Sequence, residues 1–482
     1  MTELQEVDVE VLPPERFEDV LEAPQWQMLD EANRAARDLF AGRAIWSVSS
    51  TAVGGGVAEM LQSLLAYTRG AGVDARWLVI EGEPEFFALT KRLHHKLHGS
   101  TGDGGPLGAA ERRLYERVTD GNAAAVRELV RPGDLVLLHD PQTAGIAAAL
   151  NGTGAHIIWR SHIGVDTPND AVRAAWAFLL PYVTHANAFI FTRRAYVPPE
   201  LADADISIIP PSIDVFSQKN HAMTEPQVLS ILINAGILGG DPPGEPTFVH
   251  HDGSIDHVRR RAVMDEDVRL TALDPLVVQV SRWDPLKDPI GVMRGFAEHV
   301  AARVPAARLL LAGPSPEGVT DDPEGAVVLE QVRAARLALP VEVRGRIHLA
   351  SLPMADRSEN AAIVNAVQRH AAVVVQKSLA EGFGLTVAEA MWKQRAVVAP
   401  RLGGIQDQIQ NGVNGVLLDD ATDLAAFGAA VAGLLEDPER AALIGDAAHE
   451  RVRAQFLGSR HLIQYLALFS RLMRGDVRPA VT

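Results

Sequence analysis

The sequence predicts an α/β chain of two Rossmann-like, doubly wound domains that face a central cleft. The chain has 482 residues, more than one hydrophobic core usually serves. Short apolar runs alternate with longer helical patterns over most of its length, which is typical of parallel βαβ units with helices on both faces of each sheet. This alternation breaks between residues 236 and 271 and then resumes, so we expect one domain on each side of the break.

The apolar runs have the length of buried strands and fall into two series. The first series comprises residues 44–48, 76–80, 134–138, 156–159, 188–191 and 207–209. The second comprises residues 276–280, 308–312, 346–349, 371–375, 396–398 and 415–418. A glycine-rich turn follows the first run and leads into a helical pattern over residues 57–67, as expected for a strand-turn-helix unit.

The break between the two series contains residues that stop regular structure. Residues 239–246 read Gly-Gly-Asp-Pro-Pro-Gly-Glu-Pro, which cannot lie inside a helix or a central strand. A basic cluster at 259–261 and an acidic cluster at 265–267 follow. We therefore predict an N-terminal domain over 1–235, a connector with an excursion over 236–271 and a C-terminal domain over 272–455. A helix in 456–482 is expected to pack back on the N-terminal domain.

The composition of the chain excludes several kinds of site and of binding partner. The chain has no cysteine, which excludes disulfides, thiolate metal sites, iron–sulfur clusters and cysteine nucleophiles and fits a reducing compartment. The N-terminus is acidic without an apolar core, and no run approaches the roughly 20 apolar residues of a membrane span. We therefore expect a cytoplasmic protein without a membrane partner. The net charge of −16 argues against nucleic acid, although a local basic pocket could still hold a small anion.

The most specific motif lies between two glutamates at a strand-to-helix turn. Glu381 and Glu389 flank it, and the residues between them include Gly382, Phe383, Gly384, Leu385 and Thr386. The glycines permit close approach of the backbone, so amides at the new helix N-terminus can face a phosphate while the carboxylates bond sugar hydroxyls. The alternative is structural: Thr386-x-x-Glu389 has the form of a capping box.

A second motif, residues 281–289, follows the apolar run 276–280. Arg282 and Lys287 in this loop suit a diphosphate, with the arginine acting as a fork and the lysine as a point charge. The alternative is a solvated loop with surface pairs between Arg282 and Asp284 or between Lys287 and Asp288.

Two weaker signals lie in the first half of the chain. Three glycines at 54–56 follow a predicted strand but match neither a dinucleotide fingerprint nor a phosphate-binding loop with Gly-Lys-Ser/Thr. His139 and His162 stand at the ends of two predicted parallel strands, where active-site groups collect. A single histidine is more often structural than catalytic, so both interpretations stay open for each.

In this order and spacing the four segments resemble the retaining glycosyltransferases of family 4, which have the GT-B fold. Glu381 and Glu389 match the E-x7-E signature of that family. Within it the chain is similar to the trehalose glycosyltransferring synthases and to the related trehalose phosphorylases. The supporting segments are residues 50–59, 81–91, 139–142, 159–162, 209–214, 219–220, 280–289, 321–325 and 376–392, so the resemblance spans roughly residues 43 to 460.

The resemblance implies transfer of glucose from a nucleoside diphosphate glucose to free glucose, giving trehalose reversibly and with retention. It implies that Glu381, His162, Arg282 and Lys287 act in catalysis and that Asp140, Arg160 and His162 lie on the acceptor side. Residues implied to bind the nucleotide sugar are Gly55, Gly56, Arg282, Lys287, Glu381, Gly382, Phe383, Gly384, Leu385, Thr386 and Glu389. Arg282 and Lys287 match the diphosphate ligands, Glu389 the ribose ligand, and Gly55 and Gly56 the loop that closes over the donor. No cofactor or metal is required, Mg²⁺ is a candidate stimulant, and the partners are small sugars, with a homodimer as the candidate assembly.

Two departures concern the acceptor. Gly164 stands where the family segment carries an acid, and the excursion over 236–271 is longer than a plain connector. A trehalose phosphorylase, a transferase with another small sugar or polyol as acceptor, and a binding protein without catalysis therefore remain as alternatives. The base of the donor nucleotide and the direction of the reaction also stay open.

Overall fold

The computed structural model describes residues 4–53, 55–316 and 324–475. Gly54 and residues 321–323, which belong to two of the segments above, lie outside the described residues. The chain forms two compact units: unit 1 comprises Met1–Ser212 with Phe456–Thr482, and unit 2 comprises Ile213–Gln455. Each unit contains one seven-stranded sheet.

The sheet of unit 1 has the strand order β1-β3-β2-β4-β5-β6-β7. The strands are β1 (Gln5–Val7), β2 (Ala44–Ser49), β3 (Asp74–Val79), β4 (Leu135–His139), β5 (His156–Ser161), β6 (Ala188–Phe191) and β7 (Ile206–Ile208). Strand β1 pairs antiparallel with β3, and the other pairs are parallel. The chain order reverses at β2, which lies between β3 and β4, so this is the topological switch point of unit 1.

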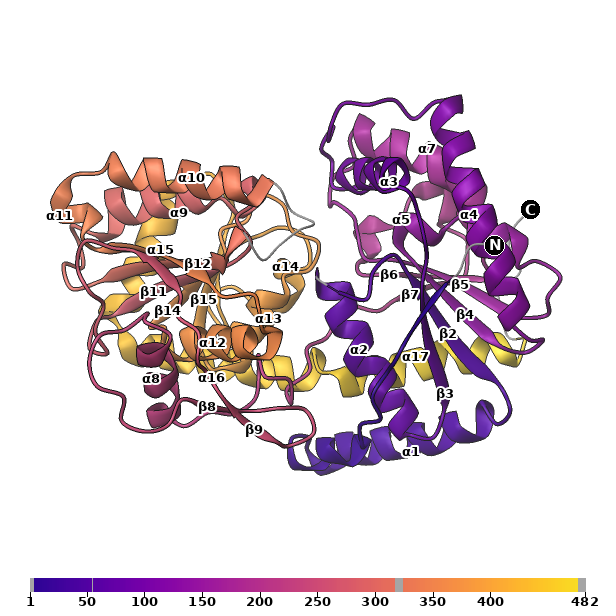
Figure 1. Ribbon diagram of the computed structural model, residues 1–482, viewed down its shortest axis with the longest axis horizontal. Coiled ribbons are helices and arrows are strands. Elements are labelled where there is room, and N and C mark those ends of the chain that lie inside the picture. Colours follow the sequence, from indigo (N-terminus) through magenta and orange to yellow (C-terminus); the bar gives the residue numbers. More distant parts are fainter. Residues whose placement is uncertain (1–3, 54, 317–323, 476–482) are drawn as a thin grey trace. The chain divides into compact units, whose positions relative to one another are not determined.

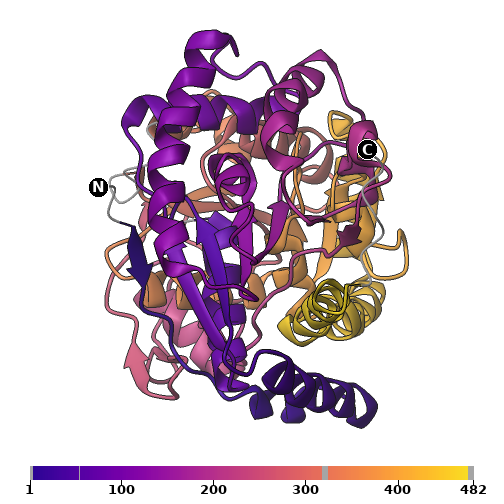
Figure 2. The same cartoon turned by 90° about the vertical axis from the view of Figure 1, so that its right-hand side faces the viewer.

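Helices cover both faces of this sheet because its strands are apolar on both sides (Figure 1). One face carries α3 (Pro84–Leu97), α4 (Ala109–Leu129), α5 (Asp140–Thr143), α6 (Ile146–Ala149) and α7 (Asp170–Val183). The other carries α1 (Ala23–Leu39), α2 (Gly55–Gly70) and α17 (Gly458–Met473), and α1 packs against α17 (Figures 1 and 2). Alternate strand residues serve the two cores: Val136 and Leu138 face the first, and Leu135 and Leu137 the second.

The sheet of unit 2 has the strand order β10-β13-β12-β11-β14-β15-β16. Its strands are β10 (Val263–Asp265), β11 (Leu276–Val280), β12 (Arg308–Pro314), β13 (Ile347–Leu352), β14 (Val373–Val375), β15 (Ala396–Pro400) and β16 (Val416–Leu418). Strand β10 is antiparallel to β13, and the remaining pairs are parallel. The switch point lies at β11, between β12 and β14. A separate antiparallel pair joins β8 (Thr247–Val249) and β9 (Ile255–His257).

The core of unit 2 follows the same principle. Helices α9 (Pro289–Gly295), α10 (Glu324–Leu337) and α15 (Leu424–Glu436) pack over one face, and α8 (Glu225–Asn234), α12 (Arg357–His370) and α13 (Leu385–Trp392) lie on the other (Figure 1). Helix α16 (Pro438–Gln455) packs against α13 and β15. The shorter helical segments are η1 (Pro14–Asp19), η2 (Arg194–Tyr196), η3 (Pro199–Leu201), η4 (Pro285–Lys287), η5 (Phe296–Val300), α11 (Val341–Arg344) and α14 (Ile405–Gln408).

The predicted α/β fold is confirmed, because every predicted apolar run contributes to a strand of one of the two sheets. The excursion differs from its description as a connector. It carries β8 and β9, and β10 extends the sheet of unit 2 as an antiparallel edge strand. These strands have three residues each, too few to show a clear periodicity in the sequence.

The units also divide the chain earlier than the boundary we placed after residue 235. Unit 2 begins at Ile213 and includes α8, which packs against α12. Residues 456–482, where we expected a helix that packs back on the N-terminal domain, belong to unit 1. No helix in the described part of the chain is long and apolar enough to span a membrane.

Candidate active site

The predicted site residues of unit 2 lie on two loops that leave neighbouring strands at the switch point and in the helix α13 that follows the second loop. The loop after β11 carries Arg282 and Lys287, and the loop after β14 carries Glu381. Parallel strands that diverge in this way leave a crevice outside their carboxyl ends, and ligands of doubly wound folds bind there. Topology therefore explains why two motifs about 100 residues apart in the sequence meet in the fold.

A direct ion pair joins these two loops. The Lys287 Nζ donates a hydrogen bond to Glu381 Oε2 at 2.6 Å, and the hydroxyl of Ser378 reaches the same oxygen at 3.3 Å. The lysine and glutamate side chains are 18% and 14% exposed, so the pair is largely shielded from water yet still accessible. The alternative pair between Lys287 and Asp288 is wrong, because Asp288 bonds elsewhere.

Asp288 instead fixes the backbone that presents Lys287. It adopts a left-handed conformation with φ of 48°, and its Oδ1 accepts a hydrogen bond from the Gly291 amide at the start of α9. Its Oδ2 pairs with the ammonium of Lys377, which is fully buried. The side chain of Gln279 forms a second link between the two loops. Its Nε2 donates a hydrogen bond to the Lys287 carbonyl at 2.8 Å, and its Oε1 accepts one from the Lys377 amide at 3.1 Å.

Arg282 lies on the same loop but is 61% exposed, and its guanidinium forms an ion pair with the Asp284 carboxylate at 3.7 Å. The surface pair that we considered as the alternative for Arg282 is therefore present. A solvated ion pair of this kind contributes little to the stability of the fold.

The start of α13 rules out the capping-box interpretation of Glu389. The helix begins at Leu385 after Gly384, which has φ of 85° and caps the helix without a side chain. Thr386 donates its hydroxyl to Gln376 Oε1 at 3.0 Å, so it does not serve as a cap. Only glycine adopts this backbone readily, which fits the place of Gly384 at the start of α13.

Glu389 is buried in the first turns of α13, with 4% of its side chain exposed. Its Oε1 lies 3.6 Å from the Lys219 Nζ, and within the described residues its Oε2 has no hydrogen-bond partner. The Lys393 ammonium bonds the Glu389 carbonyl at 3.1 Å, together with Asn220 and Gln368. Burial lowers the pKa of Lys393 well below its usual value, and the Glu389 charge acts in the opposite direction.

In unit 1 the predicted site residues Asp140 and His162 lie at the carboxyl ends of two neighbouring parallel strands, one of which borders the switch-point strand β2. Asp140 follows β4 directly, and His162 follows β5, its parallel neighbour. The Asp140 Oδ1 accepts a hydrogen bond from the His162 amide at 2.8 Å, and the Asp140 carbonyl accepts one from the Trp159 indole at 3.1 Å. Asp140 has φ of 62°, an uncommon conformation for a residue with a side chain and one that clusters at functional sites.

Burial changes the titration of this group. It raises the pKa of Asp140 to about 7, against the hydrogen bond from His162 and the charge of Arg160, which act in the opposite direction. Burial lowers the pKa of His162 well below its ordinary value, and the charge of Arg160 adds to this effect. Both side chains keep some exposed surface although protein surrounds them. The site therefore holds a neutral imidazole beside a carboxyl group that titrates near neutrality.

Arg160 does not take the acceptor-side position that we expected. It is fully buried on the side of the sheet that α17 covers, and it bonds His461, Tyr465 and the Ile209 carbonyl. The His461 ring then bonds Ser212 at 3.0 Å. Strand alternation directs Arg160 into this core, so its contacts are those of a structural residue that ties α17 to β5.

Two glycine positions complete the picture of unit 1. Gly55 begins α2 with φ of 78°, and a Cβ there would meet no atom within 4 Å, so Gly55 leaves open space at the start of this helix. Gly164 lies in a tight place, because a Cβ would stand 2.1 Å from Cγ of Tyr196. The side chain of Tyr196 therefore fills the space that an acid at position 164 would need.

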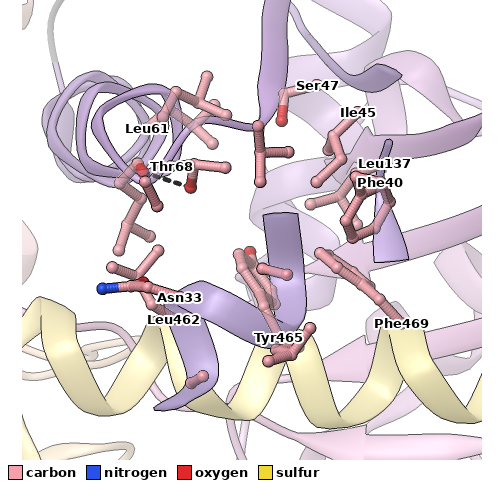
Figure 3. A pocket seen from close by; sticks show the side chains of 17 residues that line it. Asn33, Phe40, Ile45, Ser47, Leu61, Thr68, Leu137, Leu462, Tyr465 and Phe469 are labelled. Atoms are coloured by element: carbon pink, nitrogen blue, oxygen red, sulfur yellow. Dashed lines mark hydrogen bonds between the residues drawn. The ribbon is translucent and has the colours of Figure 1, made fainter. Parts of the chain in front are cut away.

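The described residues contain a well-formed apolar pocket away from these loops (Figure 3). It lies in unit 1 beneath α17, where Tyr465, Leu462 and Phe469 face Phe40 and Leu61. Its volume is about 50 Å³, far below the several hundred Å³ of ordinary ligand pockets, and no predicted site residue lines it. Within the described ranges no group of three or more His, Asp or Glu side chains could hold a metal ion.

Most of the polar residues at the strand ends could be predicted from the sequence, but several were assigned no role. Lys219, Asp288 and Lys377 were among them. Lys377 shortly follows β14, and Asp288 lies in the loop after β11, so their positions in the sequence could have indicated both residues. The contact of Lys219 with Glu389 spans 170 residues and has no signature in the sequence.

Comparisons with known proteins identify the family of this chain. Residues 47–198 match the family described as trehalose synthase, N-terminal domain, and residues 264–451 match glycosyl transferases group 1. The chain is 35% identical to a trehalose synthase of Rubrobacter xylanophilus over 90% of this chain and 91% of that protein. It is 34% identical to a trehalose synthase of Pyrococcus horikoshii over 89% and 90%, respectively.

Solved structures support the fold. An α,α-trehalose-phosphate synthase (UDP-forming) from Burkholderia xenovorans has a TM-score of 0.65 at 16% identity, covering 90% of this chain and 100% of that one. A sucrose-phosphate synthase from Thermosynechococcus elongatus has a TM-score of 0.61 at 16% identity with the same coverage. These likenesses establish the GT-B type of α/β fold. With relatives above 30% identity along nine-tenths of its length, the chain belongs to the trehalose synthase family of group 1 glycosyltransferases.

Proposed function

We propose that this glycosyltransferase moves glucose from a nucleoside diphosphate glucose to free glucose, forming trehalose with retention at the donor carbon. The observation that carries the proposal is the Lys287–Glu381 pair at the switch point of unit 2, in a chain of the trehalose synthase family. The pair combines a cation for a diphosphate with a carboxylate for sugar hydroxyls.

The charges on the two unit 2 loops suit the donor. When the bond between sugar and diphosphate breaks, positive charge develops on the sugar and negative charge on the leaving group. Lys287, which is held by its ion pair, and Arg282, which is more exposed, are cations that stabilise this negative charge. The amides at the start of α13 add partial positive charge. The acceptor then attacks from the face that the diphosphate leaves, so no enzymic nucleophile is needed.

Unit 1 supplies groups that suit a sugar rather than a charged acceptor. His162 is a neutral imidazole, and Asp140 carries a carboxyl group whose pKa burial raises to about 7. Arg160, the cation nearest to them in the sequence, is buried against His461 and Tyr465. Groups that donate and accept hydrogen bonds without a fixed positive charge favour the hydroxyls of a free sugar over a sugar phosphate.

The test is a screen of donors and acceptors. The protein is incubated with ADP-, UDP- or GDP-glucose and glucose, and the product is identified by NMR. A disaccharide with two equivalent α-anomeric protons supports the proposal. Nucleotide release only with a different sugar or polyol would end the trehalose assignment, and conversion of trehalose and phosphate to glucose 1-phosphate would establish the phosphorylase instead.

Three finer properties belong to the same proposal. The reaction proceeds in the presence of EDTA, and Mg²⁺ increases its rate without being required. The enzyme acts in the cytoplasm on small sugars. It forms a homodimer, and a sedimentation experiment would measure the mass of that assembly. Loss of all activity on chelation, restored by a divalent cation, would contradict the first of these.

A further inference from the structure

His139 and His162 form a histidine pair in unit 1, and His139 has so far been given no role. His139 ends β4, and His162 follows the end of β5. The His139 Nδ1 lies 3.1 Å from the His162 Nε2, and the rings stack with centroids 5.4 Å apart and an interplanar angle of 19°. This distance is that of a hydrogen bond, so one ring donates and the other accepts.

Both rings are neutral, which makes the direction of this bond meaningful. Burial lowers the pKa of His139 to about 3, with the Arg160 charge as the further cause. Burial also lowers the pKa of His162, and the charges of Arg160, His139 and His461 add to that effect. A neutral imidazole carries its proton on one nitrogen, and the hydrogen bond at the other nitrogen selects which.

The surroundings of His139 distinguish the two directions. Its side chain is 2% exposed, and among the described residues its Nε2 has no hydrogen-bond partner. If His162 donated, His139 would accept at Nδ1 and carry its own proton on that partnerless Nε2. If His139 donates from Nδ1, its Nε2 is only an unpaired acceptor. Buried N–H groups without an acceptor are the rarer and costlier arrangement, so His139 is the donor.

We propose that His139 is a positioning residue that holds His162 in the tautomer with its proton on Nδ1, so that His162 offers an N–H donor to a sugar oxygen. The part that concerns the sugar rests on the proposed function. The backbone supports the same geometry, because Asp140 accepts from the His162 amide and the Thr143 hydroxyl bonds the His139 carbonyl at 2.8 Å. The His139-Asp140 dipeptide thus fixes both the ring and the main chain of His162.

The tautomer can be measured directly. Protein labelled with ¹⁵N-histidine gives separate signals for protonated and bare ring nitrogens, and a His162→Gln variant identifies those of His162. The expected result between pH 6.5 and 8, above the ordinary histidine pKa, is a protonated Nδ1 and a bare Nε2 for His162. A proton on Nε2, or on both nitrogens, would overturn the proposal. This readout does not depend on which sugar the enzyme uses.

Two variants of similar shape, H139N and H139D, test the consequence for catalysis. The amide of an asparagine can still donate from the place of Nδ1, whereas an ionised aspartate can only accept. We expect H139N to keep the His162 tautomer and most of the activity. We expect H139D to move the proton of His162 to Nε2 and to lower kcat by about 10-fold or more, while the donor affinity changes little.

A buried histidine of unit 2 provides the matched control. His348 is fully buried in β13 and contacts none of the candidate site residues discussed above. The H348N variant should leave the His162 signals unchanged. An H139D enzyme that is folded, keeps the bare Nε2 and retains full kcat would refute the positioning role. If trehalose proves not to be the product while the tautomer is as expected, only the proposed function fails.

Discussion

Replacing Lys287 with methionine removes the ammonium from the proposed diphosphate site while preserving the length and much of the volume of the side chain. In the free enzyme that ammonium donates a 2.6 Å bond to Glu381, and both side chains are mostly shielded from water. In the transition state we expect it to face the departing diphosphate as well. A hydrogen bond to a charged group contributes about 3 kcal/mol at the upper end, which corresponds to about a 100-fold loss in kcat/KM.

The same structure predicts a separate effect on stability. K287M leaves the Glu381 carboxylate with the Ser378 hydroxyl at 3.3 Å but without its ammonium. We expect a decrease of about 1 to 3 kcal/mol in the free energy of unfolding, because a shielded charge loses its partner. The double variant K287M/E381Q should recover part of this loss, since neither charge then remains unpaired.

Steady-state kinetics with the natural donor and urea unfolding monitored by circular dichroism measure the two effects. The matched control is K96M, which removes a lysine of α3 in unit 1 that belongs to neither of the two unit 2 loops. A folded K287M enzyme with kcat/KM within a few-fold of the wild type would refute the role of Lys287 at the leaving group. Additive stability losses in K287M and E381Q would refute the ion pair.

Three further predictions follow from buried contacts. E389Q should weaken binding of the nucleoside diphosphate by about 10-fold with little change in melting temperature. If Glu389 bonds the ribose hydroxyls, calorimetry with a 2′,3′-dideoxy analogue should show equal affinity for E389Q and the wild type. G164D should lower the free energy of unfolding by about 3 kcal/mol or more, because its Cβ would overlap the ring of Tyr196. The double variant G164D/Y196A should lose less stability than G164D. An unchanged melting temperature of G164D would contradict the overlap. The Asp140 carboxyl has a folded pKa of about 7, above its ordinary value near 4. Its protonated form therefore stabilises the folded protein below about pH 4, and this contribution to the free energy of unfolding is lost as the pH rises to about 7. D140N should therefore gain stability relative to the wild type over that interval in denaturant titrations, and a constant difference would exclude the raised pKa.

The sequence by itself determined the architecture and the chemistry of the strand ends. Runs such as 134–138 and 276–280 have the length of a strand and carry apolar residues on both faces, which is typical of a buried parallel sheet between helices. Gly384 could be assigned to a turn because glycine alone adopts that backbone readily. Motifs in the segments that follow such runs indicated Arg282, Lys287, Glu381 and His162, and the resemblance to a known family added Asp140.

The tertiary structure alone decided what these residues contact. Both Arg160 and His162 stand near the end of one strand, yet Arg160 turns into the core beneath α17 while His162 pairs with His139. Nothing in the local sequence distinguishes the two, because the partners, His461 and His139, lie 301 and 23 residues away. In the same way Lys287 pairs with Glu381 rather than with the adjacent Asp288. Periodicity reports which face of an element is apolar, whereas ion pairs and tautomers depend on distances between elements, and only the packed sheets set those distances.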